Sequence, residues 1–295
     1  MIYTLTFSPA LDLCMWADSL EPGLTNRSHK ELINVGGKGI NVSVVLNELG
    51  FKSTALGFVG GFVGDEIERR LKQMNITADF VHLNENSRIN VKLMGTKETE
   101  INAKGPTIDS KALNLLFEKL NSLNSGDTLI ISGSAPEGAI PKVLEAVADR
   151  GVLTVVDTSR KNLLDSLKYR PFFIKPNKQE VEELFNVTCG SLEDISKCAD
   201  KLINMGAENV AVSLGKDGVL FKNKEAEVFV AAPKGEVINT VGSGDSLVAG
   251  FVAGYINKKD FEYAIKLGVA CGSATAFSPA LATAQRINEA LDSMD

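Results

Sequence analysis

The stretch "NVGGKGINVSVVLNELGFKSTALGFVG", residues 34–60, decides the fold that we expect. It opens with a glycine-rich turn, and apolar residues then recur at helical spacing, among them Ile40, Val44 and Val45. Gly50 follows this helical pattern at the position where glycine commonly ends a helix. A short apolar run closes the stretch as a buried strand. A turn, a helix and a buried strand in this order are typical of an α/β protein.

The same alternation continues along the chain. A β-rich run opens the sequence at residues 2–8, and further short apolar runs cover 127–133, 151–159, 172–177 and 209–215. Helical patterns lie at residues 64–75, 110–120, 140–150, 178–185 and 191–205. Buried strands that alternate with helices predict a three-layer α/β/α fold with a mainly parallel central sheet.

One region departs from this pattern. In "SRINVKLMGTKETEIN", residues 87–102, polar and apolar residues alternate with the period of a half-exposed antiparallel hairpin around Gly95-Thr96-Lys97. Residues 13–20 and 26–35 can add strands to it. We expect a small β-sheet lid, formed by insertions around 11–35 and 86–103 within a single domain of residues 1–295. A surface hairpin without a function is the alternative.

Composition excludes several functions. The net charge of −6 gives no general attraction to nucleic acid or to an anionic membrane, so we expect neither as a partner. Four cysteines without paired spacing and two isolated histidines argue against a zinc site or a disulfide framework, and fit a reducing cytoplasm. The apolar N-terminus has no basic leading segment and contains Asp12, which favours a core strand over a signal peptide. No apolar run reaches the roughly 18 residues of a membrane span.

Ligands of an open parallel sheet bind at the carboxyl ends of its strands, where several turns are polar or glycine-rich. The first is "GGKGIN", residues 36–41. Its glycines allow backbone N–H groups to approach a ligand, the following helix N-terminus is partly positive, and Lys38 and Asn41 add a charge and an amide. A tight turn with a solvated lysine is the alternative.

Three more turns have two interpretations each. "SGSAP", residues 132–136, offers hydroxyl groups after a strand. In "KPNKQE", residues 175–180, Glu180 can complete a capping box with Asn177 or can hold hydrated Mg²⁺ beside phosphates. "SLGKDG", residues 213–218, can curl around a nucleotide or can form a hairpin turn.

The last turn is "GSGD", residues 242–245, which precedes an apolar helix. Asp245 is either an ordinary first-turn residue that suits the helix dipole or a catalytic carboxylate. Common alternatives are missing from the sequence: it contains no P-loop, no G-x-G-x-x-G fingerprint and no G-x-S-x-G elbow.

Taken together, "GGKGIN" and "NTVGSGDSLVAGF", residues 239–251, resemble the two signatures of the ribokinase-like (pfkB) carbohydrate kinases. The resemblance spans the whole chain and includes "SPALD" at 8–12, where the family usually has Asn-Pro, as well as "SGSAP", "NKQE" and "SLGKDG". It implies the ribokinase-like fold and ATP-dependent phosphorylation of a sugar.

Within that family, "SPALD", "SRINVKL" and "GSATAF" are most similar to members that act on ketohexose monophosphates. The resemblance favours fructose 1-phosphate as the acceptor, with fructose 1,6-bisphosphate as the product, and tagatose 6-phosphate is the alternative acceptor. A catalytically inactive regulator that binds nucleotide or sugar phosphate is the non-enzyme alternative, although the intact Asp245 and Glu180 argue against it.

The resemblance also implies roles for individual residues. Asp245 is the catalytic base, and the backbone N–H groups of Gly242, Ser243 and Gly244 form an anion hole. The residues expected to bind the sugar phosphate are Asp12, Arg27, Gly36, Gly37, Lys38, Asn41, Arg88 and Ser134. Arg27 and Arg88 lie on the lid and suit the phosphate that the sugar already carries, because a guanidinium can donate to two phosphate oxygens.

The remaining expectations concern the nucleotide and assembly. The residues expected to bind ATP are Lys175, Asn177, Ser213, Gly215, Lys216, Gly218 and Gly244. Glu180 is expected to organise Mg²⁺, and a monovalent cation activates members of this family. "CGSATAF", residues 271–277, lines an adenine pocket or packs tightly against another helix. The resemblance further implies a homodimer, and the cysteine usage predicts a cytoplasmic location.

Overall fold

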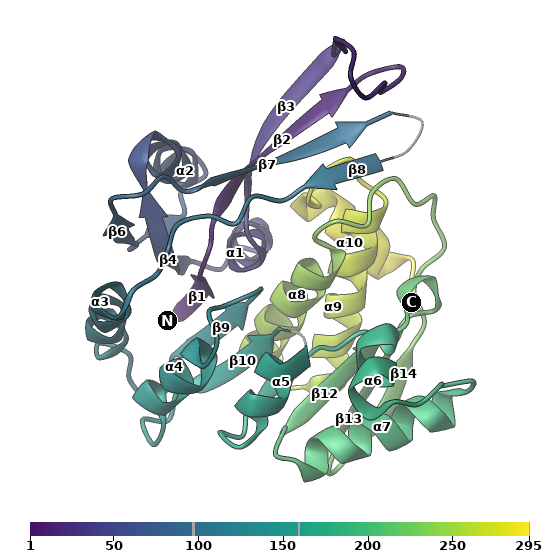
Figure 1. The fold of residues 1–295 in the computed structure, drawn as a ribbon. Coiled ribbons are helices and arrows are strands. Elements are labelled where there is room, and N and C mark those ends of the chain that lie inside the picture. Colours follow the sequence, from purple (N-terminus) through teal and green to yellow (C-terminus); the bar gives the residue numbers. More distant parts are fainter. Residues whose placement is uncertain (96–97, 159, 295) are drawn as a thin grey trace.

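The computed structural model describes residues 1–95, 98–158 and 160–294, and within them ten strands form the main sheet (Figure 1). In spatial order these are β14 (Glu227–Val230), β13 (Val219–Asn223), β12 (Asn209–Ser213), β11 (Phe173–Ile174), β10 (Leu153–Asp157), β9 (Thr128–Ser132), β1 (Ile2–Thr6), β4 (Ser53–Gly60) and β5 (Thr77–Ala78), with β6 (Val81–Leu83) also paired to β4.

The centre of this sheet is parallel and buried on both faces. Thr4 of β1 lies opposite Ala55 on one side and Ile130 on the other, and all five residues of β1 and of β9 are buried. This explains why these strands appear in the sequence as short continuous apolar runs. At one edge β12, β13 and β14 are antiparallel: the β12–β13 hairpin is one of the two structures that "SLGKDG" allowed, whereas the pairing of β14 with β13 was not predicted.

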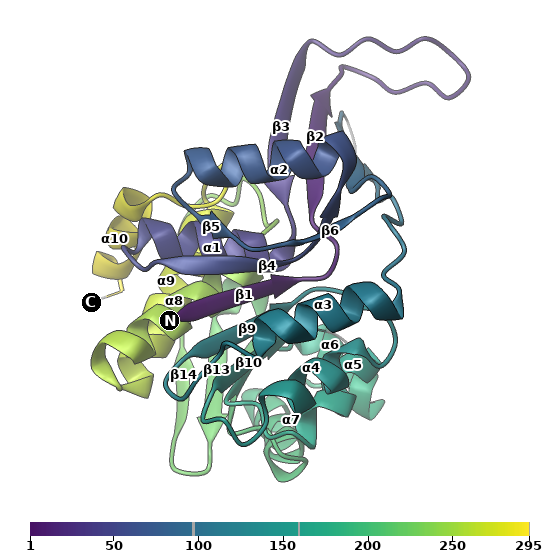
Figure 2. The ribbon, with the colours of Figure 1, turned by 90° about the vertical axis from the view of Figure 1, so that its left-hand side faces the viewer.

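Helices cover both faces of the sheet, so the expected three-layer α/β/α fold is confirmed (Figures 1 and 2). One layer contains α1 (Lys38–Glu48), α2 (Gly61–Gln73), α8 (Ser243–Lys258), α9 (Phe261–Ala276) and α10 (Ala284–Asp292). The other contains α3 (Ser110–Leu120), α4 (Ala139–Val147), α5 (Arg160–Leu167), α6 (Lys178–Phe185) and α7 (Leu192–Asn204). None of the helices in the described ranges has the length and apolarity needed to cross a bilayer.

A separate small sheet projects from the body, as Figure 2 shows. Its strand order is β3 (Lys30–Gly36), β2 (Ala10–Trp16), β7 (Arg88–Met94) and β8 (Glu98–Ile101). The antiparallel pairing of β7 with β8 confirms the predicted hairpin, and Thr96 and Lys97 of its predicted turn lie outside the described residues. That this sheet acts as a lid, and that the chain is a single domain, remain predictions. We refer to it as the small sheet.

Helix α8 is anchored to the main sheet by aromatic packing. The Phe251 ring stacks on Phe173 of β11 with 3.7 Å between ring centroids, and it also contacts Phe221 of β13. A Cβ on Gly250 would lie 2.7 Å from Cys271 Sγ, so α9 packs closely against the other side of α8. Both helices are therefore fixed relative to the sheet, and this fixes the N-terminus of α8 at the carboxyl ends of the strands.

Candidate functional site

The two glycine-rich signatures meet in space. Asn41, in the first turn of α1, donates a hydrogen bond of 2.7 Å to Oδ2 of Asp245, in the first turn of α8. The two residues are 204 positions apart in the sequence. Two helix N-termini therefore face the same point, and each adds partial positive charge there.

Asp245 is a buried carboxylate with only 5% of its surface exposed. Burial, together with the negative charge of Asp157, raises the pKa of Asp245 to about 6, although Lys38, the Asn41 hydrogen bond and Lys175 oppose this shift. The preceding Gly242 has φ +82°, and a Cβ there would lie 2.5 Å from Leu281. The left-handed backbone of this turn therefore favours glycine, and a larger residue would also require the Leu281 side chain to move.

Asp157, at the end of β10, is a site residue that the sequence analysis missed. Its carboxylate lies 3.5 Å from Lys38 Nζ and 3.4 Å from Lys175 Nζ, with 4% of the side chain exposed. Burial opposes its ionisation, but Lys175 and Lys38 outweigh burial and hold the pKa of Asp157 below its usual value. The available signal was an acidic residue at the carboxyl end of a buried strand, in "TVVDTS", residues 154–159.

Positive charge is concentrated at the start of α8. A Cβ on Gly244 would lie 3.1 Å from Lys175 Nζ, so the ammonium group contacts the first turn of the helix. A cation at a helix N-terminus is unfavourable unless an anion lies nearby. Asp157 supplies one such charge, and Lys38 and Lys175 can pair with further anions such as phosphate oxygens.

Several buried polar atoms at this point fit a polar ligand. Among the described residues, Ser132 Oγ and Ser243 Oγ are buried without a hydrogen-bond partner, and Asp157 Oδ2, also without a hydrogen bond, lies 3.5 Å from Lys38 Nζ. Buried polar atoms are normally paired, so these atoms suit the oxygens, waters or metal ions that a phosphate group brings with it. The carboxylate oxygens of Asp157 are also the kind of ligand that Mg²⁺ prefers.

Glu180 forms the capping box that the sequence allowed. Its Oε2 accepts from the Asn177 N–H at 2.7 Å, and Asn177 Oδ1 accepts from the Glu180 N–H at 2.8 Å. The capping interaction engages one carboxylate oxygen of Glu180, and a carboxylate has lone pairs for more than one partner. Its role with Mg²⁺ remains a prediction; within the described ranges no cluster of three or more acidic, His or Cys side chains could hold a metal by itself.

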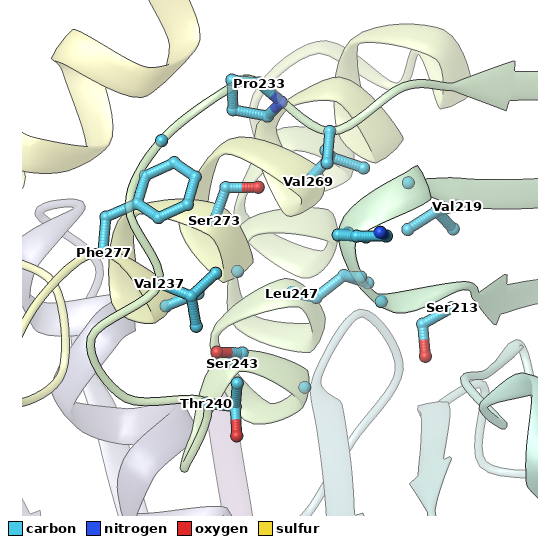
Figure 3. Close-up of a pocket in the computed structure, with 18 of the residues that line it drawn as sticks. Ser213, Val219, Pro233, Val237, Thr240, Ser243, Leu247, Val269, Ser273 and Phe277 are labelled. Atoms are coloured by element: carbon cyan, nitrogen blue, oxygen red, sulfur yellow. The ribbon is translucent and has the colours of Figure 1, made fainter.

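A cavity of about 430 Å³ opens beside the N-terminus of α8 (Figure 3). It is lined by the β12–β13 hairpin, by the loop after β14 and by helices α8 and α9. Five of the predicted residues line it: Ser213, Gly215, Lys216, Gly218 and Gly244. Ser243 lines it as well, and the "CGSATAF" segment contributes Gly272, Ser273, Ala276 and Phe277. Its walls are mostly apolar, and its size is that of a pocket for a drug-sized ligand or cofactor.

"SLGKDG" forms the hairpin turn that the sequence allowed, and its contact with a nucleotide stays a prediction. Strands β12 and β13 pair as an antiparallel hairpin, with a short 3₁₀ turn (Gly215–Asp217) between them, and this turn borders the cavity. Asn177 pairs with Ser213 as an isolated β-bridge, which places the start of α6 beside the same turn.

The predicted sugar-side residues separate into two groups. Asp12 and Arg88 lie on neighbouring strands of the small sheet, and Arg88 Nε donates to the Ser8 carbonyl at 3.1 Å. A Cβ on Gly36 would lie 2.7 Å from both Asp12 carboxylate oxygens, so Gly36 packs directly on that side chain. Arg27 instead lies in the exposed loop after β2, at the end of the small sheet remote from Asp12.

Two more predicted residues, Gly37 and Ser134, lie in turns near Lys38. Gly37 has φ +126°, and a Cβ there would lie 2.8 Å from Thr6. Ser134 follows Gly133, where an added Cβ would lie 3.7 Å from Lys38. The structure therefore brings the ends of β1, β9 and β10 together around this lysine. The roles assigned to these residues remain predictions.

This fold and this arrangement of strand-end turns define a phosphotransferase of the ribokinase-like class. Residues 7–287 match the family described as pfkB family carbohydrate kinase. The chain belongs to the pfkB family, and the expected ribokinase-like fold is confirmed.

Similar proteins agree with this assignment. A 1-phosphofructokinase of Bacillus subtilis is 40% identical over 99% of this chain and 97% of its own length. A D-tagatose-1-phosphate kinase of Bacillus licheniformis is 38% identical over 98% and 97%, and a tagatose-6-phosphate kinase of Staphylococcus epidermidis is 32% identical over 92% and 91%.

Solved structures show the same architecture. Phosphofructokinase-2 from Escherichia coli, in complex with substrates and products, superposes with a TM-score of 0.93 at 28% identity, covering 99% of this chain and 98% of that one. A ribokinase from Thermotoga maritima shares the fold with a TM-score of 0.82 at 18% identity, covering 99% of both chains.

Proposed function

We propose that the protein transfers the γ-phosphate of ATP to a ketohexose monophosphate, and that it converts fructose 1-phosphate to fructose 1,6-bisphosphate. The observation that carries the proposal is the buried Asp245 carboxylate, held by Asn41 at a glycine turn beside two lysines. This arrangement offers a base for a hydroxyl group and positive charge for a transferred phosphoryl group.

In the proposed step, the sugar 6-hydroxyl oxygen forms a bond to the γ-phosphorus while the bond from that phosphorus to the β–γ bridging oxygen breaks. The hydroxyl proton passes to Asp245, and ADP leaves. Backbone N–H groups of residues 242–244 donate to the phosphoryl oxygens as charge develops on them. Lys175 contacts the same turn and stabilises that charge.

The cavity beside α8 is the proposed site of the adenine and ribose. It ends at Ser243 and Gly244, so a nucleotide with its base among Val269, Ala276 and Phe277 would direct its phosphates toward Asp245. Mg²⁺, held through water by Glu180 and Asp157, would neutralise phosphate charge. The side chains themselves orient the triphosphate: Lys38 and Lys175 pair with its oxygens, and the glycine turn admits it.

The sugar would lie between the small sheet and α1. Asp12 would accept hydrogen bonds from its hydroxyl groups, and Arg88 would bind its existing phosphate. The relatives named 1-phosphofructokinase and D-tagatose-1-phosphate kinase both support a 1-phosphate at this position. Tagatose 6-phosphate remains the second candidate acceptor, supported by the third relative.

A coupled assay of ADP formation tests the proposal. It compares fructose 1-phosphate, tagatose 1-phosphate, tagatose 6-phosphate, fructose 6-phosphate and unphosphorylated fructose at equal concentrations, with and without Mg²⁺. We expect the highest kcat/KM with fructose 1-phosphate. Preference for an unphosphorylated sugar would refute the sugar-phosphate assignment, and no ATP turnover with any of them would favour a binding protein.

We also propose that the protein forms a homodimer through the apolar face of the small sheet. Ile33, Leu13, Val91 and Ile101 are aligned across its four strands, and Ile33 and Ile101 are 40% and 59% exposed. A second copy that buries this row would remove apolar surface from water. Light scattering of the purified protein tests this, since a monomer at micromolar concentration would contradict it.

A further inference from the structure

The Asp12 carboxylate is enclosed by its neighbours in the small sheet. Asn90, its register partner on β7, donates from Nδ2 to Asp12 Oδ1 at 2.9 Å. Lys92 Nζ lies 3.4 Å from the other oxygen, Oδ2, and 3.7 Å from Glu100 of β8. Each carboxylate oxygen therefore has its own partner, while Gly36 closes the side toward β3.

These partners are themselves well buried. Asn90 is 6% exposed, and the Lys92 side chain is 12% exposed although it carries a full charge. A lysine seldom occupies such a position unless its ammonium group is paired. Strand alternation places residues 88, 90 and 92 on one face of β7, so Arg88, Asn90 and Lys92 form a polar row along Asp12.

Asn90 also connects Asp12 to Arg88. Its Oδ1 accepts from the Ala103 N–H at 3.2 Å, and the Ala103 carbonyl accepts from Arg88 Nη1 at 3.4 Å. One buried amide thus joins the carboxylate assigned to sugar hydroxyls and the guanidinium assigned to the sugar's phosphate. A shift of either group would strain the hydrogen bonds of the other.

We infer that Asn90 and Lys92 are positioning residues for sugar-phosphate binding: they fix both oxygens of Asp12, and Asn90 couples Asp12 to Arg88 through Ala103. This rests on the proposed function, which gives Asp12 and Arg88 their substrate. Neither Asn90 nor Lys92 needs to touch the sugar. Their effect passes through Asp12, which a double-mutant cycle can isolate.

The experiment compares Lys92→Met in the wild type and in an Asp12→Asn background, using kcat/KM for the sugar phosphate. In the wild type we expect a loss of about 10-fold, mainly through a higher KM, with the KM for ATP unchanged within about 2-fold. In the Asp12→Asn background the same substitution should change kcat/KM less than about 2-fold. Lys92→Arg should retain most of the wild-type value, because it keeps the charge.

Lys30→Met is the matched control. Lys30 lies at the other end of the same sheet, with its ammonium group over the Trp16 ring. It should leave both KM values unchanged. Equal losses from Lys92→Met in both backgrounds, or no loss in the wild type, would overturn the inference.

Asn90→Ala extends the test to the coupling. It should be non-additive with Asp12→Asn and also with Arg88→Ala, whereas additive losses with both would refute the link through Ala103. If circular dichroism shows that Asn90→Ala prevents folding, the double-mutant cycle of Lys92→Met with Asp12→Asn remains the test of the inference. Failure of the proposed function is distinguishable, because the wild type would then phosphorylate none of the sugar phosphates.

Discussion

Asn41 holds Asp245 across the interface between α1 and α8 with a hydrogen bond of 2.7 Å. The bond joins the first turn of α1, which follows β3, to the first turn of α8, which follows the long loop after β14. The two helices lie near opposite ends of the sequence. An amide that donates to one carboxylate oxygen fixes the orientation of the other. In the proposed function, this hydrogen bond would set the orientation in which Asp245 meets the hydroxyl group of the sugar.

Asp245→Asn should lower kcat by about 10²–10⁴-fold, because an amide cannot accept the hydroxyl proton. Affinity for ATP, measured by calorimetry, should stay nearly unchanged. Asp260→Asn is the matched control: Asp260 caps the neighbouring helix α9, and asparagine caps equally well. A near-normal kcat for Asp245→Asn would reduce Asp245 to a helix-start residue.

The same substitution should raise thermal stability at pH 7.5. In the folded protein the pKa of Asp245 is raised to about 6, so folding favours its protonated form. The stabilisation that comes from protonated Asp245 is therefore fully present below the ordinary pKa of about 4. It is lost as the pH rises through about 6, where the buried carboxyl group ionises. Scanning calorimetry without ligands should show a higher Tm for Asp245→Asn at pH 7.5 and a smaller difference at pH 5. A lower Tm at pH 7.5 would contradict the burial cost.

The pH profile of kcat/KM should have an acid limb that is set by the ionisation of Asp245. Asp245 accepts a proton only when ionised, so kcat/KM should fall as the pH drops through about 6. Asp157→Asn removes a neighbouring negative charge, which lowers the pKa of Asp245 and moves the limb to lower pH. The pH–rate profiles of the two proteins measure this, and an unmoved limb would show that Asp157 does not act on Asp245.

Arg88→Ala should raise the KM for the sugar phosphate by about 10- to 100-fold, because a charge-assisted pair with the phosphate is lost. The KM for ATP should change far less. Arg69→Ala is the control, since Arg69 pairs with Glu66 on the exposed side of α2. Equal increases in both KM values would argue against a phosphate contact.

Gly244→Ala should lower kcat by about 10-fold, because a Cβ 3.1 Å from Lys175 Nζ forces the ammonium group to shift by a few tenths of an ångström at the glycine turn. Gly190→Ala is the control: its Cβ would meet only Asp194, at 3.9 Å, and its backbone is not left-handed. Steady-state kinetics with both variants test this. An unchanged kcat in Gly244→Ala would show that the turn tolerates a side chain.

Much of the main sheet followed from the sequence, since buried parallel strands appear as apolar runs between helices. The meeting of "GGKGIN" with "GSGD" was expected only from the resemblance to the carbohydrate kinases. The rule for carboxyl ends of parallel strands does not give it, because "GGKGIN" follows β3 of the small sheet and "GSGD" follows the loop after the edge strand β14. At the antiparallel edge, the β12–β13 hairpin was one of the two interpretations of "SLGKDG", but β14 was missed. Its four residues alternate between exposed and half-buried positions and give no continuous apolar run.

The remaining site residues depend on tertiary contacts. Asp157 carries no glycine or spacing signal, and its importance comes from two lysines on separate elements. Asn90 and Lys92 meet Asp12 only because β2 pairs in parallel with β7, some 80 positions away. No local pattern specifies which strands pair at such separation or in which register.

Strand β2 presents Asp12 to one side and Leu13 to the other, because successive side chains alternate across a pleat. Inserting or deleting one residue just before Asp12 would exchange these sides. The carboxylate would then face the apolar side chains of Leu13's face, and a leucine would face the proposed sugar site. The proposed sugar site and the proposed dimer surface therefore depend on the same register of the seven residues of β2, and a change of register would alter both.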